Sequence, residues 1–146
     1  MSFFDAIDIA ASGLTAERTR MDVTSENLAN AQTTDGANGQ PYQRQEVVLQ
    51  QVGGSTFSDT LAGAMGNSAT PGGVEVAGIV NDPTPDQLVY DPGHPGANAQ
   101  GYVKMPNVNS VTEMTDLIDE SDSYQADVTA MDTAKTMFSK TLDLLK

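Results

Sequence analysis

The chain has 146 residues, of which 38% are hydrophobic and 5% aromatic, with no Trp and no Cys. This composition predicts thin helix-on-helix packing rather than a large core, and the absence of Cys excludes a disulfide framework and a thiolate site. A net charge of −13 with seven basic residues excludes a phosphate-binding face, so we expect no nucleic acid partner. No apolar run approaches the ~20 residues that a membrane helix needs, so we expect no membrane insertion.

The first thirty residues predict an amphipathic helix. Its apolar residues recur every seventh position: Ile7, Leu14, Met21 and Leu28. Ser2 fits an N-cap, while Gly13 inside the helix costs up to ~1 kcal/mol relative to Ala. We expect this helix to end near Asn30, before a loop rich in turn residues.

The middle of the chain holds most of the Gly and nearly all of the Pro. Four short segments have the composition of strands: 42–49, 74–80, 87–90 and 102–105. The stretch 53–73 is rich in Gly, Ser, Thr and Ala and is predicted to be flexible, and Asp91 to Gly96 predicts a turn. We therefore expect a small sheet or hairpin beside the helices.

The last third of the chain predicts a second, longer helix with a stripe of apolar residues. One row recurs every seventh position: Leu117, Tyr124, Met131, Phe138 and Leu145. A second row comprises Met114, Val128 and Leu142, with Ser121 and Lys135 as interruptions. Ser110 and Glu113 fit a capping box at the start of this helix.

These elements predict a mainly α fold with a small β segment. The N- and C-terminal helices form a coiled-coil-like core, and the middle region holds short β-strands and long loops. The expected parts are the N-terminal helix in 1–31, the β and loop segment in 32–106 with its flexible stretch 53–73, and the C-terminal helix in 107–146. The seven-residue period does not decide whether the two helices pair within one chain or lie against neighbouring subunits.

Few residues suggest chemistry. His94 lies in a Pro-Gly-His-Pro turn without clustered partners, so a turn residue at an interface is favoured over a metal ligand. Asp82, Asp86 and Asp91 lack the spacing of a calcium loop and favour turn chemistry. The carboxylates after the start of the last helix are interpreted as a solvated face: Asp119, Glu120 and Asp122. We therefore expect no metal, no cofactor and no enzyme activity.

The region 12–34 carries a family signature. It resembles the N-terminal signature of bacterial flagellar rod and hook proteins, with Ser-Gly-Leu at 12–14, Asn-Leu-Ala-Asn at 27–30 and Thr33. A second stretch, 82–113, is similar in order and spacing to the proximal-rod members of that family. Its matching loop residues are Tyr90, Pro92, His94, Pro95, Tyr102, Pro106, Asn107 and Asn109. The chain departs from the family pattern at three positions of the last helix, which are Asp122, Gln125 and Asp127.

The resemblance implies a structural subunit of the proximal rod of the bacterial flagellar basal body. Such subunits assemble through terminal amphipathic helices into a helical tube that transmits torque and surrounds the export channel. The implied partners are other proximal-rod subunits, the distal-rod subunit, the rod–inner-ring junction protein, copies of itself and, during assembly, the flagellar type III export apparatus. The implied location is the periplasm-spanning rod, reached without a cleaved signal peptide, and the N-terminus indeed lacks the basic and apolar regions of one.

The expected assembly interface combines the apolar rows with two motif residues. Its members are Ile7, Leu14, Met21, Asn27, Leu28, Asn30, Met114, Leu117, Tyr124, Val128, Met131, Phe138, Leu142 and Leu145. Two other functions remain open from the residues alone. One is a cytosolic secretion chaperone or adaptor that sheathes a partner helix. The other is a wall-degrading hydrolase that uses Asp82, Asp86 and Asp91.

Overall fold

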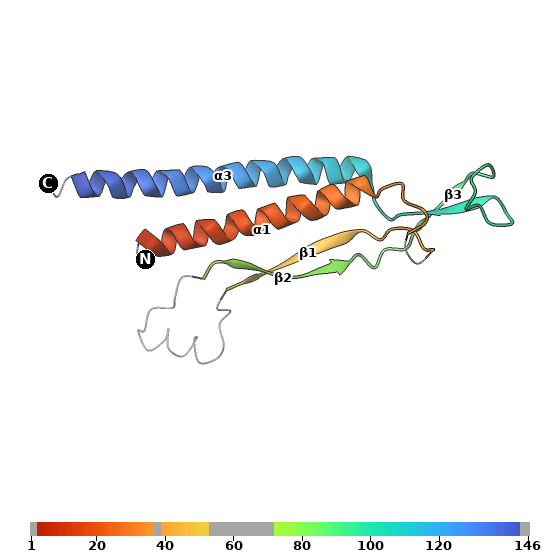
Figure 1. Cartoon of the computed structure of the whole chain (residues 1–146), viewed down its shortest axis with the longest axis horizontal. Helices are drawn as coiled ribbons and strands as arrows, with labels where there is room; N and C mark the ends of the chain where they lie inside the picture. The colour runs from red at the N-terminus through yellow and green to blue at the C-terminus, as the bar shows by residue number, and fades with distance from the viewer. Residues whose placement is uncertain (1–2, 37–38, 53–71, 144–146) are drawn as a thin grey trace, which may run out of the picture. The chain divides into compact units, whose positions relative to one another are not determined.

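The computed structural model describes residues 3–36, 39–52 and 72–143. Within these residues the helices are α1 (Phe3–Ala29) and α3 (Ser110–Asp143), and the strands between them are β1 (Gln45–Gln51), β2 (Val74–Asn81), β3 (Gln87–Tyr90) and β4 (Tyr102–Met105) (Figure 1). The strands form two two-stranded sheets, β1 with β2 and β3 with β4. The predicted fold class, mainly α with a small β segment, is confirmed. Three predictions concern residues outside the described ranges: the cap at Ser2, the part 53–71 of the predicted flexible stretch 53–73, and the apolar Leu145.

The strands lie close to their predicted positions. The segments 87–90 and 102–105 form β3 and β4, and β2 extends the predicted strand 74–80 by one residue. The first strand begins at Gln45 rather than Tyr42. The reason is that the backbone N–H of Tyr42 donates to Thr33 O at 3.0 Å, and that of Arg44 donates to the side chain of Asn107 at 2.8 Å.

The start of α3 differs from the prediction of a capping box. Asn109, one residue before Ser110, caps the helix: its Oδ1 accepts from the backbone N–H of Val111 at 3.0 Å and of Thr112 at 3.5 Å. Glu113 does not return to the helix start, because its carboxylate is buried against α1 and Arg44. The capping box prediction was therefore wrong. The cap is Asn109 rather than Ser110, and Glu113 pairs with distant residues rather than with the start of its own helix.

The chain divides into two compact units. Unit 1 comprises Met1–Thr19, Val48–Gly78 and Ser121–Lys146, and unit 2 comprises Arg20–Val47 and Ile79–Glu120. Both helices and the β1–β2 sheet contribute residues to each unit. Within each unit the two helices lie against each other in the same chain.

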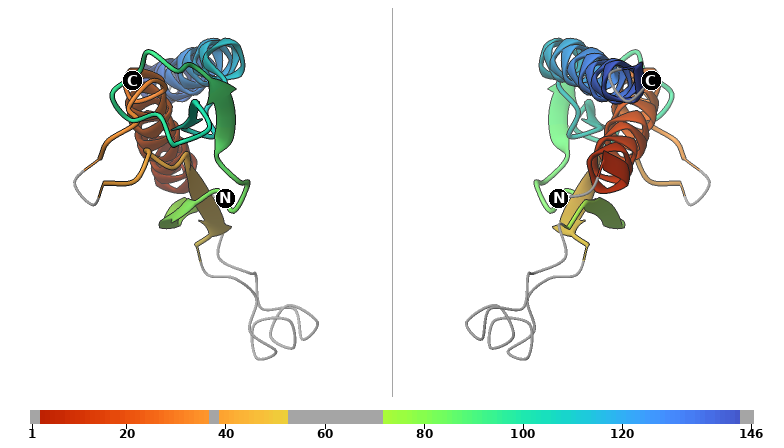
Figure 2. Two further views of the ribbon diagram at one scale, coloured as in Figure 1. Left: turned by 90° about the vertical axis from the view of Figure 1, so that its right-hand side faces the viewer. Right: turned by 90° about the vertical axis from the view of Figure 1, so that its left-hand side faces the viewer.

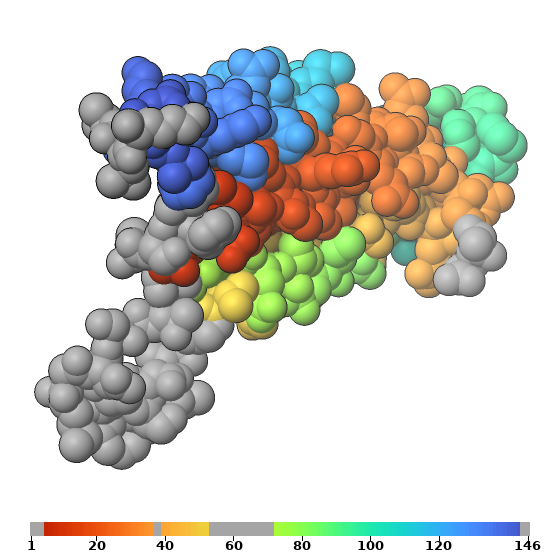
Figure 3. All heavy atoms as spheres, turned by 60° about the vertical axis from the view of Figure 1, so that its left-hand side comes forward, coloured from red at the N-terminus to blue at the C-terminus, as the bar shows by residue number. Residues whose placement is uncertain are grey.

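In unit 1 the first part of α1 lies between α3 and the β1–β2 sheet (Figure 3). Ser12 holds the sheet: its Oγ accepts from the backbone N–H of Val74 at 3.0 Å and donates to Ile9 O at 2.7 Å. Gly13 faces α3, where a Cβ would lie 2.7 Å from Asp127 Oδ2. The Gly that weakens the helix by itself therefore permits close packing of the two helices.

In unit 2 the end of α1 lies alongside the start of α3, at the side that faces the viewer in the left view of Figure 2. The two segments are antiparallel, since Asn27 pairs with Glu113 and Thr24 with Glu120. The apolar core of this unit is thin. Its buried residues are Val23, Val103, Pro106 and Val108. The remaining buried positions are polar, and they form the site described next.

Candidate assembly interface and its polar cluster

Asn27 is the centre of a buried polar cluster in unit 2. The side chain is 1% exposed and uses its full hydrogen-bonding capacity. Its Nδ2 donates to Glu113 Oε2 at 3.0 Å and to Gln45 O at 2.9 Å. Its Oδ1 accepts from the Gln45 N–H and from the Tyr42 hydroxyl, both at 2.9 Å. Asn27 thus pairs with the backbone of β1 as a neighbouring strand would, while it also holds α3.

Arg44 supplies the positive charge of the cluster. Its Nε donates to Glu113 Oε1 at 2.5 Å, and its guanidinium also pairs with Glu46, with Asp82 at 3.5 Å and with Asp116 at 3.7 Å. Partial burial lowers the pKa of Arg44, but the hydrogen bond and charge of Glu113, followed by those of Glu46, shift the net pKa upward. The buried carboxylate of Glu113 is therefore matched by a permanent cation.

Asn107 joins the loop after β4 to the residue before β1 and to the segment that follows β2. Its Oδ1 accepts from the Arg44 N–H at 2.8 Å, and its Nδ2 donates to Thr84 O at 3.0 Å and more weakly to Asp82 O at 3.4 Å. Asp82 Oδ1 in turn accepts from the hydroxyl and the backbone N–H of Thr84. These two hydrogen bonds are the main reason that the pKa of Asp82 lies below its usual value. Turn chemistry, as predicted for Asp82, is confirmed.

Glu120 makes a second polar link between the helices. It is 4% exposed, accepts from the Thr24 hydroxyl at 3.1 Å and lies 3.5 Å from Arg20 Nε. The interpretation of Glu120 as part of a solvated face was wrong, whereas Asp119 and Asp122 are exposed as predicted. Glu120 lies seven residues after Glu113, so it follows the side of α3 that faces α1.

The predicted apolar rows remain partly open to solvent. On α1 the residues of the row are half-buried, and they are Ile7, Leu14, Met21 and Leu28. On α3 the first row is half-buried at Leu117, Tyr124 and Met131, whereas Phe138 is exposed. The second row, Met114, Val128 and Leu142, is exposed. The positions that pack against α1 are instead one residue earlier than the second row, at Glu113, Glu120 and Asp127. Contact of the open rows with neighbouring subunits stays a prediction.

The two Asn residues of the N-terminal motif have different surroundings. Asn27 is buried within its own chain, so in this structure it is not part of the surface that a neighbouring subunit could contact. It affects assembly by holding α3 and β1 in place. Asn30 is half-buried at the end of α1, where Nδ2 donates to Glu26 O at 2.9 Å and Oδ1 accepts from the Thr33 hydroxyl at 3.2 Å. Asn30 therefore shapes the helix end.

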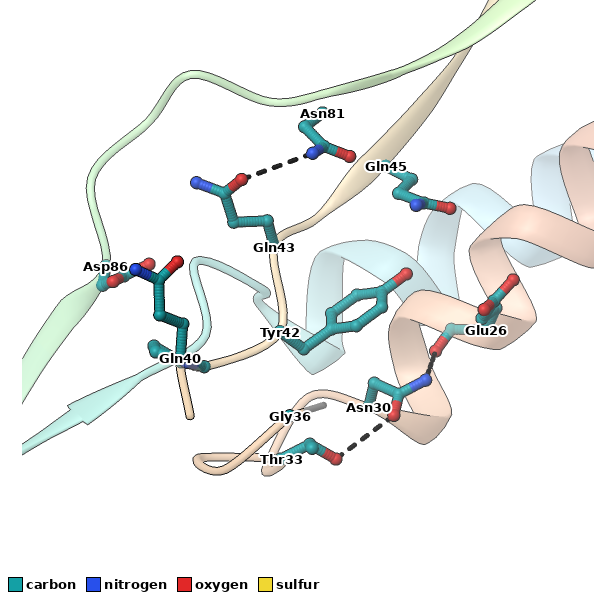
Figure 4. Close-up of a pocket in the computed structure, with 11 residues that line it drawn as sticks. Glu26, Asn30, Thr33, Gly36, Gln40, Tyr42, Gln43, Gln45, Asn81 and Asp86 are labelled. Carbon is teal, nitrogen blue, oxygen red and sulfur yellow. Dashed lines mark hydrogen bonds between the residues drawn. The ribbon is translucent and has the colours of Figure 1, made fainter. Parts of the chain in front are cut away.

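Beside this helix end, Glu26, Asn30, Tyr42 and Asp86 line a polar cleft of about 430 Å³ (Figure 4). The pKa of Tyr42 is raised by burial and, to a smaller degree, by the charges of Glu26 and Glu113. The Tyr42 hydroxyl is therefore held in its neutral, donating form, which its bond to Asn27 requires.

The predicted motif loop forms the β3–β4 hairpin and its flanks. Tyr90 pairs with Tyr102 across the sheet, with ring centroids 5.3 Å apart and an edge-to-face angle of 66°. His94 is a turn residue as predicted, since its Nδ1 accepts from the Gly96 N–H at 3.0 Å. Pro92 and Pro95 lie exposed in this turn, and Pro106 is fully buried beside the polar cluster residue Asn107.

Sequence reasoning missed Tyr42, Arg44 and Glu120 as members of the site. A signal was present for the acidic residues, because Glu113, Glu120 and Asp127 also recur every seventh position. Arg44 and Tyr42 had no comparable signal, since their partners are distant in the sequence. In the described part of the chain, no group of three or more His, Asp or Glu residues is arranged to hold a metal ion. Neither described helix has the length and apolar character needed to cross a bilayer.

Family comparisons match both ends of the chain. The family model described as "Flagella basal body rod protein" matches residues 7–38, and the model described as "Flagellar basal body rod FlgEFG protein C-terminal" matches residues 99–144. The first match contains Asn27 and Arg20, and the second contains Asn107, Glu113 and Glu120.

Full-length relatives agree with these models. The chain is 47% identical to "Flagellar basal-body rod protein FlgC" of Bacillus subtilis (strain 168), with 100% of each chain covered. It is 45% identical to the protein of the same description in Escherichia coli O157:H7, over 99% of this chain and 98% of the relative. It is 39% identical to that of Borreliella burgdorferi, over 100% and 99%. The chain belongs to the FlgC family of flagellar basal-body rod proteins.

Proposed function

We propose that the two terminal helices of this chain build the wall of the proximal rod by packing their open apolar rows against neighbouring subunits. As a member of the FlgC family, the chain is a structural subunit of the proximal rod of the flagellar basal body, and it assembles with other rod components. The comparisons lend no support to the alternative of a secretion chaperone. The relatives are rod proteins, so a structural role is also favoured over that of a hydrolase.

The observation that carries the proposal is the contrast between the two sides of α3. Polar residues hold α3 to α1 within the chain, at Glu113 and Glu120. The large apolar residues Met114, Val128 and Leu142 instead face solvent. Water-exposed apolar area is unfavourable by ~25 cal/mol per Å², so neighbours that cover these residues would gain stability. The contact of α3 with α1 is thus polar, whereas the exposed row of α3 is apolar. This arrangement suits a subunit whose apolar residues become buried only when it assembles.

The proposed partners are the other proximal-rod subunits, the distal-rod subunit, the rod–inner-ring junction protein and further copies of the chain. The parts of the chain that we assign to the rod core are the helical regions 1–31 and 107–146, with the middle region 32–106 facing outward. We also propose that the chain crosses the flagellar type III export apparatus unfolded and folds at the growing tip, in the periplasm-spanning rod. Its apolar core is thin, and buried polar residues link the two helices in unit 2, which is consistent with a fold that opens easily for export.

A gene replacement tests this proposal. The chain is expressed in a flagellated bacterium that lacks its own FlgC protein, and basal bodies are purified and imaged by cryo-electron microscopy. We expect swimming to be restored, with two long helices per subunit in the density of the proximal rod. A chain that restores swimming without entering the basal body, or that stays in a soluble cytosolic complex, would overturn the proposal. A triple variant, Asp82→Asn, Asp86→Asn, Asp91→Asn, tests the hydrolase alternative. If the chain were a hydrolase, this variant would lose cell-wall lysis rather than the ability to form a rod.

A further inference from the structure

Two exposed apolar faces of unit 2 have complementary character. The hairpin face consists of Leu88, Tyr90, Tyr102 and Lys104. These four residues lie on one side of the β3–β4 sheet, because Leu88 is opposite Lys104, Tyr90 is opposite Tyr102, and side chains alternate along a strand. The other side of the sheet carries Val103, which is buried. All four residues of the hairpin face are therefore exposed to solvent.

The second face, the helix face, consists of Val111, Met114, Ile118 and Asp119 on the first turns of α3. The spacing of the three apolar residues places them on one side of the helix, with exposures of 74%, 53% and 62%. Asp119 follows at the border of this stripe and is also exposed. The helix face is opposite in position to Glu113 and Glu120, which turn toward α1.

The charges of unit 2 indicate what covers these faces. The unit holds three basic residues: Arg20, Arg44 and Lys104. Arg20 pairs with Glu120, and Arg44 pairs with four carboxylates. For Lys104 the described residues supply no ion pair, and it borders an aromatic surface. A partner for this face therefore needs an apolar surface with a carboxylate at its edge. The helix face has that composition.

We infer that copies of this chain join by docking the hairpin face of one copy onto the helix face of the next, with Lys104 of the first beside Asp119 of the second. The inference deepens the proposed function and rests on it. The edge-to-face pair of Tyr90 and Tyr102 is a rigid aromatic anchor, which is the kind of residue that dominates interface energies. Met114 adapts to such a surface because its side chain is flexible. The Lys–Asp pair gives a locally attractive contact between chains that otherwise repel through a net charge of −13 each.

The contact joins two different surfaces, so it is heterologous. The copy that contributes its hairpin face keeps a free helix face, and the copy that contributes its helix face keeps a free hairpin face. Further copies can therefore add in a row that closes into a ring or continues as a helix. A self-complementary contact between two hairpin faces would instead stop at a dimer. The experiment must therefore show whether the contact joins two different faces or two copies of the same face.

Disulfide crosslinking in assembled basal bodies gives that test, because the natural chain contains no Cys. Cells without their own FlgC protein express a mixture of two variants, Leu88→Cys and Ile118→Cys, and are treated with a mild oxidant. We expect a crosslinked dimer only when both variants are present. The matched control replaces Leu88→Cys with Asp35→Cys, an exposed loop position outside both faces, and should give no dimer. Dimers from Leu88→Cys alone, crosslinks only to a different protein, or no crosslink in assembled rods would each overturn the inference.

A charge exchange provides a second readout that leaves both apolar faces intact. Lys104→Glu or Asp119→Lys alone should lower the yield of the crosslinked dimer by roughly two- to fivefold, the range of an exposed ion pair. The two changes combined should restore the yield. Equal yields in all variants would contradict the Lys104–Asp119 contact. Swimming and recovery of the chain with basal bodies are scored in the same cells, so a failed crosslink with normal rods refutes only this inference. Absence of the chain from basal bodies would refute the proposed function.

Discussion

Asn27 of α1 donates a hydrogen bond to Glu113 of α3 at 3.0 Å, and both side chains are 1% exposed. The two residues are 86 positions apart in the sequence. The same Asn27 side chain bonds both backbone groups of Gln45, so one motif residue fixes both a helix and a strand. The helices of unit 2 are thus held by a satisfied polar network rather than by apolar packing alone.

We expect Asn27→Ala to lower the free energy of unfolding by about 3 kcal/mol, because it removes the hydrogen bonds of Asn27 to Glu113 Oε2 and to the backbone N–H and C=O of Gln45, all on the buried side of α1. Urea denaturation of the purified chain, followed by circular dichroism, measures this change. Asn30→Ala is the matched control from the same motif. Its side chain is half-buried and bonds Glu26 O and Thr33, so we expect a loss of about 1 kcal/mol or less. Equal losses for both variants would refute the role given to Asn27.

Arg44→Ala should lower the free energy of unfolding by roughly 3 kcal/mol or more, because a buried carboxylate at Glu113 would lose its cation. Arg44→Lys should recover only part of the loss, since an ammonium group lacks the planar fork that reaches several carboxylates. Arg18→Ala removes the same charge from an exposed position on α1 and should change stability by no more than about 0.5 kcal/mol. The measurement is again urea denaturation, and a full recovery by Lys would show that charge alone is sufficient.

Gly13 gives a prediction in which two effects oppose each other. Gly13→Ala favours the helix by about 1 kcal/mol, but its Cβ would lie 2.7 Å from Asp127 Oδ2 and force that side chain to move. We expect the full gain only in the background of Asp127→Ala, with a smaller gain or a loss in the natural chain. A double-mutant cycle of thermal unfolding measures the difference. Additive effects would show that Gly13 and Asp127 do not meet in solution.

The position of the helices and strands could be predicted from the sequence because it depends on local periodicity. The side of α3 that packs against α1 could not, since a row with Met114 and Val128 looks more suitable for a core than one with Glu113 and Glu120. The acidic row is buried because Arg44, Asn27 and Thr24 supply its partners. Those partners come from distant segments, and no local pattern reveals them.

The cap of α3 illustrates a smaller difference of the same kind. Both Asn109 and Ser110 are good capping residues, and Glu113 fits a capping box with Ser110. Because Glu113 pairs with Arg44, its carboxylate is not available for a capping box, and Asn109 caps the helix instead. Where one side chain can serve a local or a distant partner, the sequence alone favours the local one, and here the distant one prevails.

Acid should destabilise the chain partly through Asp82. Its pKa lies below the ordinary value of 3.8 when the chain is folded, so near this pH the folded state binds fewer protons than the unfolded state. The stability contributed by Asp82 is therefore present above pH 3.8 and is lost as the pH falls through the lower, folded pKa. Thr84→Val removes the hydroxyl donor and should raise the pKa of Asp82 toward its ordinary value. An NMR titration of the Asp82 carboxyl group checks this, and an unchanged pKa would contradict the assigned cause.

The most direct test of the central claim is the accessibility of Met114 before and after assembly. A Met114→Cys variant provides a single thiol, because the natural chain has none. Its reaction with a maleimide is measured in the free chain, in purified basal bodies and in basal bodies dissolved by denaturant, which gives the full signal. We predict fast labelling of the free chain, where Met114 is exposed, and strong protection within the rod. Equal labelling of the free chain and the intact rod would contradict the claim that neighbouring subunits cover the open apolar row of α3.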